Sequence, residues 1–393
     1  MSYKAILSYA WDFADHGVGA SISAFKEMGL DTISLAGTYH AGKFLRPQGK
    51  SGKVYFPEDG TAYFRHDDTR YGAIKPAPNS LLAERDILGE LCDDGRLNVN
   101  VWLVLMHNTR LGMAHPDAVV RNAFGDPYFY NLCPSAPAAR AYAIGLAQDV
   151  TESYPVSGLS LEAPGFTPYA HGFHHEMSFV RQDPMFEGLM GLCFCDHCVS
   201  AAEAKGVDAR GLKAYVANRL ESFLDSDIDI PDDMGRAFWM AEIATNPELR
   251  AYLDFRSQQV TSLVAEIRDT VRADAEVAVI PSVARPTGGA WYEGTDLRAI
   301  AKVTGIIEAC FYEPSAARIA ADLFDLKHRV PNETTIRGIL RPSYPDIESK
   351  AEFLAAVDIL AQGGVTDLAF YNWGHQRRRN IEWIGEALAR VPQ

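Results

Sequence analysis

The sequence predicts a (β/α)₈ barrel, and three observations support this fold class. Apolar, β-branched segments alternate with helical patterns along nearly the whole chain. The apolar segments are almost continuous, as expected for parallel strands that crossover helices bury on both faces. The length of 393 residues suits one barrel with insertions, and eight strand–helix units in a row favour a closed barrel over an open sheet.

The units follow one another in a regular order. The expected strands lie at 3–10, 30–39, 97–107, 156–164, 275–283, 304–312, 334–342 and 365–374. Helical patterns lie at 20–29, 80–95, 136–154 and 249–273, and one helical segment follows each later strand. The stretch "SYAWDFADHGVGA" after the first strand lacks the glycine spacing of a dinucleotide-binding loop, which disfavours a nicotinamide-dependent oxidoreductase.

Domain organisation and charge narrow the class of protein further. We expect one barrel domain over 1–393, with a large insertion, 163–248, after the fourth strand. A net charge of −14 and a pI near 5.3 argue against nucleic acid or an anionic membrane as partner, and the basic run "QRRR" is too short to change this. The first residues form no signal peptide or membrane span, so we expect a cytoplasmic protein. A homo-oligomer is left open.

Side chains at the carboxyl ends of barrel strands are the candidates for binding and catalysis, because barrel enzymes place their sites there. The candidates for binding are Trp11, Asp12, Tyr39, His107, Asn108, Arg285, Tyr312, Arg341, Asn372 and Trp373, with Tyr9, His40 and Tyr371 at neighbouring positions. Aromatic rings stack on the C–H faces of sugars, and carboxylates and amides bind hydroxyl groups. The set therefore predicts a small carbohydrate ligand, although any single ring could equally well only line the barrel rim.

Glu162 is the first candidate for acid–base catalysis. It ends the fourth strand after the apolar run "VSGLSL", and apolar neighbours raise the pKa of a carboxyl group as a general acid requires. A structural carboxylate bonded to loop amides is the alternative. Glycosidases need a second carboxyl group in a different environment. We expect Glu313 in "CFYEP" as this partner, with Asp346 as an alternative and Glu308 inside the barrel. The two roles could be exchanged between Glu162 and Glu313.

Two further groups of ionisable residues flank these candidates. The segment "HGFHHEMSF" contains His171, His174, His175 and Glu176, which are expected to bind sugar hydroxyls, to hold a second metal, or to form a plain surface loop. The segment lacks the i, i+4 histidine pair of metallohydrolases. Arg285 and Arg341, at strand ends, are expected to bind a carboxylate or phosphate bidentately, or only to neutralise nearby carboxylates.

The segment "CFCDHC" holds three of the six cysteines, Cys193, Cys195 and Cys198. Three thiolates at this spacing can fold onto one tetrahedral zinc ion, whereas three free cysteines packed as small apolar residues are the alternative. Candidates for the fourth ligand are Cys133, His197 and the histidines of 171–175. Cys133 is the best choice, since its loop should emerge on the same face of the barrel. Four thiolates leave no open position for water, so this zinc would be structural.

The order of these motifs resembles glycoside hydrolase family 42, the barrel β-galactosidases. "LCPSAPAAR", "LSLEAP" and "LCFCDHCVSAAEAKG" follow one another over about 130–200. The resemblance implies that Cys133, Cys193, Cys195 and Cys198 bind a structural Zn²⁺ and that Glu162 is the acid/base glutamate. The chain differs from the family in having Leu161 where an asparagine precedes that glutamate. It also has no glutamate at the end of the seventh strand, where the family's nucleophile lies.

Together these observations predict a glycoside hydrolase-like enzyme that cleaves a small glycoside or oligosaccharide with two carboxyl groups. The first alternative is a metal-dependent sugar isomerase, epimerase or aldolase, in which the histidine segment holds the cation. The second is a catalytically inert sugar-binding barrel, which the missing seventh-strand glutamate favours. Metal analysis and a panel of aryl glycosides distinguish these three functions.

Overall fold

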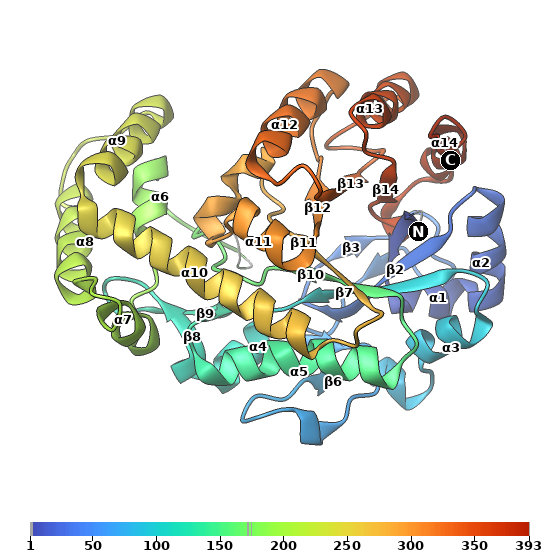
Figure 1. Ribbon diagram of the computed structural model, residues 1–393, viewed down its shortest axis with the longest axis horizontal. Coiled ribbons are helices and arrows are strands. Elements are labelled where there is room, and N and C mark those ends of the chain that lie inside the picture. The colour runs from blue at the N-terminus through green and yellow to red at the C-terminus, as the bar shows by residue number, and fades with distance from the viewer. Residues whose placement is uncertain (1–2, 171–172, 174, 393) are drawn as a thin grey trace.

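The fold is a closed barrel of eight parallel strands, which confirms the predicted fold class (Figure 1). The computed structural model describes residues 3–170, 173 and 175–392. The strand order is β1-β14-β13-β12-β11-β10-β7-β2, and β2 pairs again with β1 to close the barrel. Every one of these pairings is parallel, as the crossover helices require.

Each predicted strand segment contains one barrel strand. The barrel strands are β1 (Lys4–Ser8), β2 (Thr32–Tyr39), β7 (Asn98–Val104), β10 (Gly158–Glu162), β11 (Glu276–Ile280), β12 (Ile306–Cys310), β13 (Thr335–Leu340) and β14 (Asp367–Phe370). Short strands in the loops are β3 (Phe44–Leu45), β4 (Val54–Tyr55), β5 (Thr61–Ala62), β6 (Ala77–Pro78), β8 (Val119–Arg121) and β9 (Pro127–Leu132). The barrel strands are almost entirely buried, which explains their continuous apolar character.

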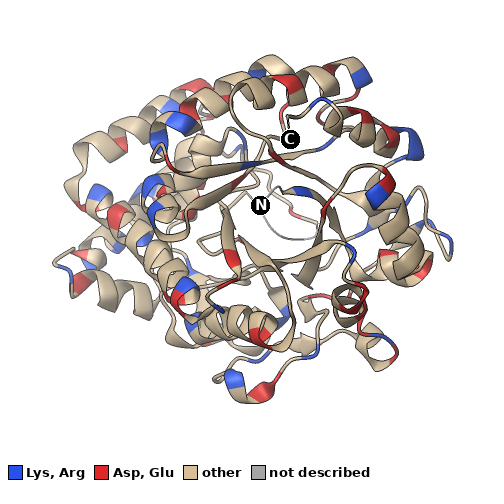
Figure 2. Ribbon diagram, turned by 45° about the vertical axis from the view of Figure 1, so that its right-hand side comes forward, with Lys and Arg blue, Asp and Glu red and all other residues tan. Residues whose placement is uncertain are grey.

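Helices surround the barrel on the outside. They are α1 (Ala10–His16), α2 (Val18–Glu27), α3 (Ile87–Asp94), α4 (Thr109–Ala114), α5 (Pro137–Ser153), α6 (Pro184–Met190), α7 (Asp196–Glu203), α8 (Ala209–Leu224), α9 (Asp232–Thr245), α10 (Pro247–Thr270), α11 (Leu297–Thr304), α12 (Ala316–Arg329), α13 (Lys350–Gln362) and α14 (Arg378–Leu388). Positive and negative side chains mix along these helices, while the strands carry few charges (Figure 2). No helix in the described part of the chain is both long and apolar enough to cross a membrane.

Local sequence signals set several helix boundaries. The long helix α10 begins after Asn246, whose side chain accepts a hydrogen bond from Leu249 N over 3.1 Å, and Pro247 occupies its first position. The helix predicted over 80–95 is instead divided in two, a 3₁₀ turn at Ser80–Ala83 and α3. The division has a clear cause, because Asp86 caps α3 through Gly89 N and so starts a new helix.

The segment between β10 and α10 forms an additional helical layer. It contains α6, α7, α8 and α9, which lie together at one side of the barrel, and α8 and α9 contact α10 (Figure 1). Asp183 caps α6 and is completely buried, so this segment is tightly folded from α6 onward. Residues 163–170, which follow β10, border the barrel mouth, where the candidate site lies.

Candidate active site

A cavity of about 440 Å³ opens at the carboxyl ends of the barrel strands. Residues from all eight barrel strands or from the loops after them contribute to its wall. Its lining contains two carboxylates, two guanidinium groups and two histidines among aromatic and small apolar side chains. This size and composition fit a small polar ligand, because ligand pockets are mostly apolar with a few convergent polar groups.

Glu162 is the last residue of β10, and its side chain lines this cavity. One carboxylate oxygen accepts a hydrogen bond from the indole N–H of Trp102 on the neighbouring strand β7. Burial raises the pKa of Glu162 to about 7, and the hydrogen bond from Trp102 opposes that rise. Ala163 follows with a φ of 49°, a left-handed conformation that is uncommon for a residue with a Cβ. The backbone therefore changes direction directly after Glu162, and Ala163 also lines the cavity.

Glu293 is the second carboxylate of the cavity. It ends a 3₁₀ helix, Thr287–Glu293, in the loop after β11, and its Oε1 accepts a hydrogen bond from the Ser282 hydroxyl. Burial raises the pKa of Glu293 to about 8; the Ser282 hydrogen bond lowers it and the negative charge of Glu162 raises it further. The two carboxyl groups are thus close enough for the ionisation of one to oppose that of the other.

Backbone contacts between the two loops hold Glu293 in this position. Phe166 N, in the loop after β10, donates to the Glu293 carbonyl oxygen over 2.9 Å. A Cβ at Gly165 would lie 2.1 Å from the same oxygen, so only glycine permits this approach. Arg256 on α10 donates to the carbonyl of Tyr292 over 3.2 Å. The second carboxylate is therefore positioned by the preceding loop and by α10 together.

Aromatic side chains form much of the remaining wall. The rings that line the cavity are Tyr39, Trp102, Tyr312 and Tyr371. The hydroxyl of Tyr9 lies 3.0 Å from that of Tyr39 and 2.9 Å from that of Tyr371, so three phenols form one hydrogen-bonded group. Rings fixed in this way offer flat apolar faces together with hydroxyl groups, which are the two kinds of contact that a sugar requires.

The structure brings together only part of the predicted site. The predicted residues that line the cavity are Tyr39, His107, Glu162, Arg285, Tyr312 and Arg341. Those that lie outside it are Trp11, Asp12, Asn108, His175, Glu313, Asn372 and Trp373. His174 falls outside the described residues.

Four of the residues outside the cavity make contacts that explain their position. Asp12 pairs with Arg46 over 2.8 Å, and burial raises its pKa to about 6. Asn108 caps α4 by accepting from Leu111 N over 2.9 Å. Trp373 packs on Phe13 and Phe25. Trp11 stacks on Tyr9 with ring centroids 4.2 Å apart, behind the cavity wall. These side chains support the barrel mouth instead of facing a ligand.

Glu313, the predicted partner of Glu162, is also outside the cavity lining. Its side chain is buried and accepts a hydrogen bond from Arg318 in the first turns of α12. Asp346, the alternative, is buried too and binds the two cavity arginines. Glu308 lies in the barrel interior as expected. The cavity therefore holds Glu293 where the sequence predicted Glu313.

Sequence reasoning missed two residues that border the cavity, Trp102 and Glu293. Trp102 lies two positions after Asn100 on β7, so the alternation of a strand could have placed it toward the barrel interior. Tyr371, in contrast, was named from sequence as a strand-end residue, and it lines the cavity directly after β14. Glu293 carried no such signal, because it lies far into a loop whose path depends on contacts with other loops.

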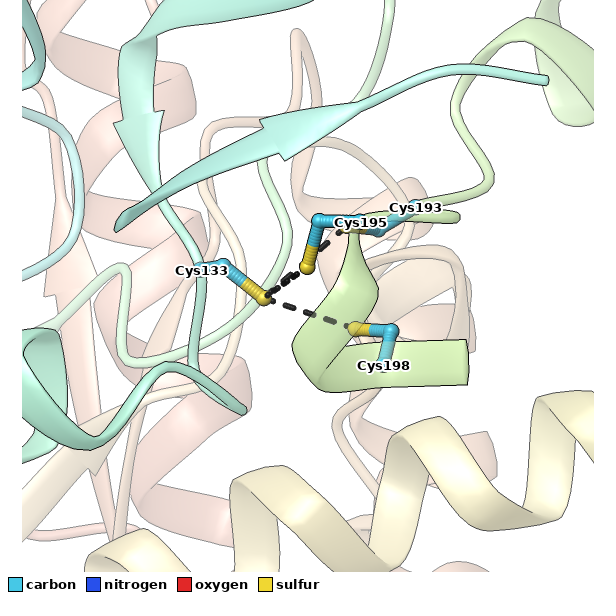
Figure 3. Close-up of side chains that lie close together, drawn as sticks. All are labelled: Cys133, Cys193, Cys195 and Cys198. Carbon is cyan, nitrogen blue, oxygen red and sulfur yellow. Dashed lines mark hydrogen bonds between the residues drawn. The ribbon is translucent and has the colours of Figure 1, made fainter. Parts of the chain in front are cut away.

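The four cysteines Cys133, Cys193, Cys195 and Cys198 form a second buried cluster, separate from the cavity (Figure 3). From the Cys133 sulfur the distances are 3.4 Å to Cys198, 3.6 Å to Cys195 and 3.9 Å to Cys193. A tetrahedral zinc ion with Zn–S bonds of ~2.3 Å sets its sulfur atoms roughly 3.8 Å apart, so the donor set fits that ion.

The surroundings of the cluster also suit bound thiolates. Ser135 N points at the Cys133 sulfur over 3.4 Å, and Arg121 N points at that of Cys193 over 3.5 Å. Arg256 is buried at 3% exposure and forms no carboxylate ion pair among the described residues. Burial lowers the pKa of the Arg256 guanidinium group, and nearby Tyr252 and cysteine side chains oppose that fall. A buried guanidinium group beside four sulfur atoms balances negative charge on them.

Comparisons with known proteins show the fold without assigning a family. No family model and no curated protein matches the chain. The glycoside hydrolase domain of PgaB (BpsB) from Bordetella bronchiseptica has a similar structure with a TM-score of 0.61 at 12% identity, covering 100% of both chains. A β-galactosidase from the psychrophilic Marinomonas ef1 has a TM-score of 0.56 at 10% identity, covering 99% of this chain and 59% of that one.

A third structure, α-L-fucosidase isoenzyme 2 from Paenibacillus thiaminolyticus, has a TM-score of 0.54 at 13% identity, covering 99% of this chain and 49% of that one. This chain thus spans about half the length of the fucosidase and somewhat more of the β-galactosidase. Their shared feature is the barrel, as it occurs in glycoside hydrolases.

Proposed function

We propose that this protein is a glycoside hydrolase whose two catalytic carboxyl groups are Glu162 and Glu293. The observation that carries the proposal is their placement in one cavity, with pKa values raised to about 7 and about 8. Glycosidases need one carboxyl group that keeps its proton near neutral pH and one that is ionised. The barrel fold shared with three glycoside hydrolase structures supports the same class of activity.

The hydrogen bonds of the two glutamates suggest their roles. An indole N–H can only donate, so the Trp102 contact favours an ionised Glu162. A hydroxyl both donates and accepts, so Ser282 can serve Glu293 with or without its proton. The order of the two pKa values agrees with this assignment. Glu293 is then the proton donor, and Glu162 is the charged partner beside the anomeric carbon.

The reaction consumes one water molecule. The bond between the anomeric carbon and the glycosidic oxygen breaks, and its electron pair stays on the leaving oxygen, which takes the proton of Glu293. The water oxygen becomes bonded to the anomeric carbon, and its released proton restores the protonated carboxyl group. Glu162 stabilises the positive charge that develops on the sugar ring.

The test is a panel of aryl and alkyl glycosides with the wild type and with Glu293→Gln. Losing a general acid typically costs 10²–10⁴-fold in rate, and most on a poor leaving group. We therefore expect Glu293→Gln to lose that factor on a methyl glycoside but little on a dinitrophenyl glycoside, which needs no protonation. The control is Glu313→Gln, which should leave both rates close to wild type. Loss of activity in Glu313→Gln alone would restore Glu313 as the partner.

The cavity composition disfavours the two alternative functions. In the parts of the chain that the structure describes, only the cysteine quartet brings three or more potential metal-ligand atoms within 4.8 Å of one another, and it does not border the cavity. A metal-dependent isomerase or aldolase would need its cation at the mouth. An inert sugar-binding barrel does not require two carboxyl groups with raised pKa values in the same cavity, whereas such groups are typical of catalytic sites.

A structural Zn²⁺ bound by the four cysteines is the second part of the proposal. Bound there, zinc would tie the loop after β9 to the start of α7 without taking part in the reaction, since four thiolates leave no position for water. The resemblance to family 42 over about 130–200 and the sulfur distances both support this ion.

Replacing one ligand tests the metal site. We expect Cys195→Ser to lower the zinc content to below stoichiometric amounts and to lower the melting temperature, because metal binding stabilises only the folded chain. Elemental analysis and differential scanning calorimetry measure the two effects. Cys92→Ser is the matched control, because Cys92 is half-buried on α3 and belongs to no cluster. Equal zinc content in both variants would contradict the assignment.

A further inference from the structure

Two arginines from distant loops meet in the wall of the cavity. Arg341 follows β13 directly, and Arg285 lies in the loop after β11. Both guanidinium groups contact Asp346: Arg285 donates to Oδ1, and Nη1 of Arg341 lies 3.1 Å from Oδ2. The Asp346 side chain is 0% exposed, whereas those of Arg285 and Arg341 are 38% and 21% exposed. The carboxylate thus lies behind the two cations, which face the cavity.

Packing holds Arg341 rigidly. The centre of its guanidinium group lies 4.1 Å from the ring centroid of Tyr312 and 5.3 Å from that of Tyr371. Its Nε is buried and has no hydrogen-bond partner among the described residues. Arg285 is tied to the carbonyl oxygen of Tyr312 as well as to Asp346. Two guanidinium groups carry ten N–H donors, and only a few of them are used by these contacts.

The charges at this place do not cancel. Two guanidinium groups face one buried carboxylate, which leaves one positive charge in the cavity wall. The other carboxyl and imidazole groups of the cavity are those of Glu162, Glu293, His40 and His107. Neither arginine forms an ion pair with Glu162 or Glu293 in the described part of the chain, so a neutral sugar would leave the excess cation and its unused donors without a direct anionic partner. A dianion such as a phosphate monoester would exceed that charge. A single negative charge on the ligand matches both the charge and the bidentate geometry of the donors.

We propose that the sugar bound in this cavity carries a carboxylate, as in a uronic acid, and that Arg285 and Arg341 bind it. This inference rests on the proposed glycosidase function and names its substrate class. The arginine pair then determines specificity, while the two glutamates carry out the cleavage.

Matched pairs of nitrophenyl glycosides test the inference. A glucuronide and a glucoside differ only at C6, where one has a carboxylate and the other a hydroxymethyl group, and the same holds for a galacturonide and a galactoside. Both anomers of each are assayed. For the wild type we expect kcat/KM to be about 10–100-fold higher for one uronide than for its neutral counterpart, as expected for charge-assisted hydrogen bonds made to one substrate only.

Variants locate the preference in the arginine pair. Arg341→Gln and Arg285→Gln should each reduce the uronide-to-neutral ratio at least tenfold. Arg210→Gln is the control, since Arg210 is 71% exposed on α8 and does not border the cavity. Because Arg285 is the more exposed of the pair, it also provides a test if Arg341→Gln fails to fold. A neutral glycoside cleaved as fast as its uronide would overturn the inference while leaving the hydrolase intact.

A binding experiment separates the two proposals if no glycoside is cleaved. Glucuronic acid, glucose 6-sulfate, glucose 6-phosphate and glucose are compared by their effect on the melting temperature of the wild type and Arg341→Gln. A rise with glucuronic acid that the variant lacks supports the carboxylate site even without hydrolysis. The inference is overturned if the melting temperature rises with glucose alone, if it rises most with glucose 6-phosphate, or if none of the four sugars raises it. If glucose 6-sulfate raises the melting temperature more than glucuronic acid does, the preferred monoanion is a sulfate ester, and the proposal of a uronic acid is overturned.

Discussion

The barrel holds carboxyl groups with raised pKa values at two levels, Glu162 and Glu293 at its mouth and Glu308 near its floor. On β10, Ser160 faces the floor and Glu162 faces the mouth; on β12, Glu308 and Cys310 occupy the same two levels. Burial raises the pKa of the carboxyl group at both levels. The two levels differ in what surrounds the carboxylate.

Every contact of Glu308 near the floor is made within the protein. Its side chain is fully buried and accepts hydrogen bonds from the hydroxyls of Tyr3, over 3.0 Å, and Ser160. The charge of Arg337 opposes the effect of burial on its pKa. Arg337 in turn lies 3.8 Å from the Tyr3 ring and pairs with Glu276. No ligand can reach this carboxylate, so its role is structural.

Glu162 and Glu293 at the mouth each accept one hydrogen bond and then face open space. Neither forms an ion pair with a basic side chain in the described part of the chain. Burial alone is therefore a poor indicator of catalysis in this barrel. A carboxyl group that is buried, incompletely paired and open to a cavity is the stronger indicator.

A pair of substitutions, one at each level of the barrel, should give the largest effect that tests this comparison. We expect Glu162→Gln to lower kcat/KM by ~10²–10⁴-fold on every leaving group without lowering the melting temperature, because an amide removes the charge at nearly the same volume. Glu308→Gln should instead lower the free energy of unfolding by roughly 3 kcal/mol, since it places an amide group against a hydroxyl donor and removes a charge near Arg337.

Steady-state kinetics normalised to folded protein, together with urea denaturation, measure both effects. The wild type and Glu308→Gln should have nearly equal kcat per folded molecule. A stable Glu308→Gln protein that has lost turnover would place the chemistry at the floor and would remove the distinction between the two levels.

The same contrast explains what could be predicted from sequence. The fold could be predicted from the length of the apolar segments and from their alternation with helical patterns. Each barrel strand is a continuous apolar segment, and its position depends on local sequence. Glu162 followed from the same rule, since it ends a strand whose direction is fixed by the barrel. The cysteine group was visible because three members lie within one short loop, and the order of segments pointed to Cys133 as the fourth.

The second carboxylate could not be found in this way. Glu313 follows a strand as closely as Glu162 does, yet Arg318 at the start of α12 binds it outside the cavity lining. Glu293 reaches the cavity only because Gly165 and Phe166 of another loop hold its backbone there. Such long-range loop contacts leave no periodic pattern in the sequence, and they decide which of several acidic residues faces the ligand.

A smaller effect, in the pH dependence of kcat/KM, sharpens the comparison further. The active form has Glu162 ionised and Glu293 protonated, so kcat/KM should rise with pH as the pair loses its first proton near 7 and fall as it loses the second near 8. On a methyl glycoside, which needs the proton, the wild type should show both limbs, whereas the residual activity of Glu293→Gln keeps the rise but lacks the fall, since its amide has no proton to lose. Glu308→Gln should keep both limbs at the wild-type positions, because its carboxyl group lies outside the cavity. A fall at high pH that persists in Glu293→Gln would assign the proton donor to Glu162 and reverse the two roles, with the mouth still as the site of chemistry.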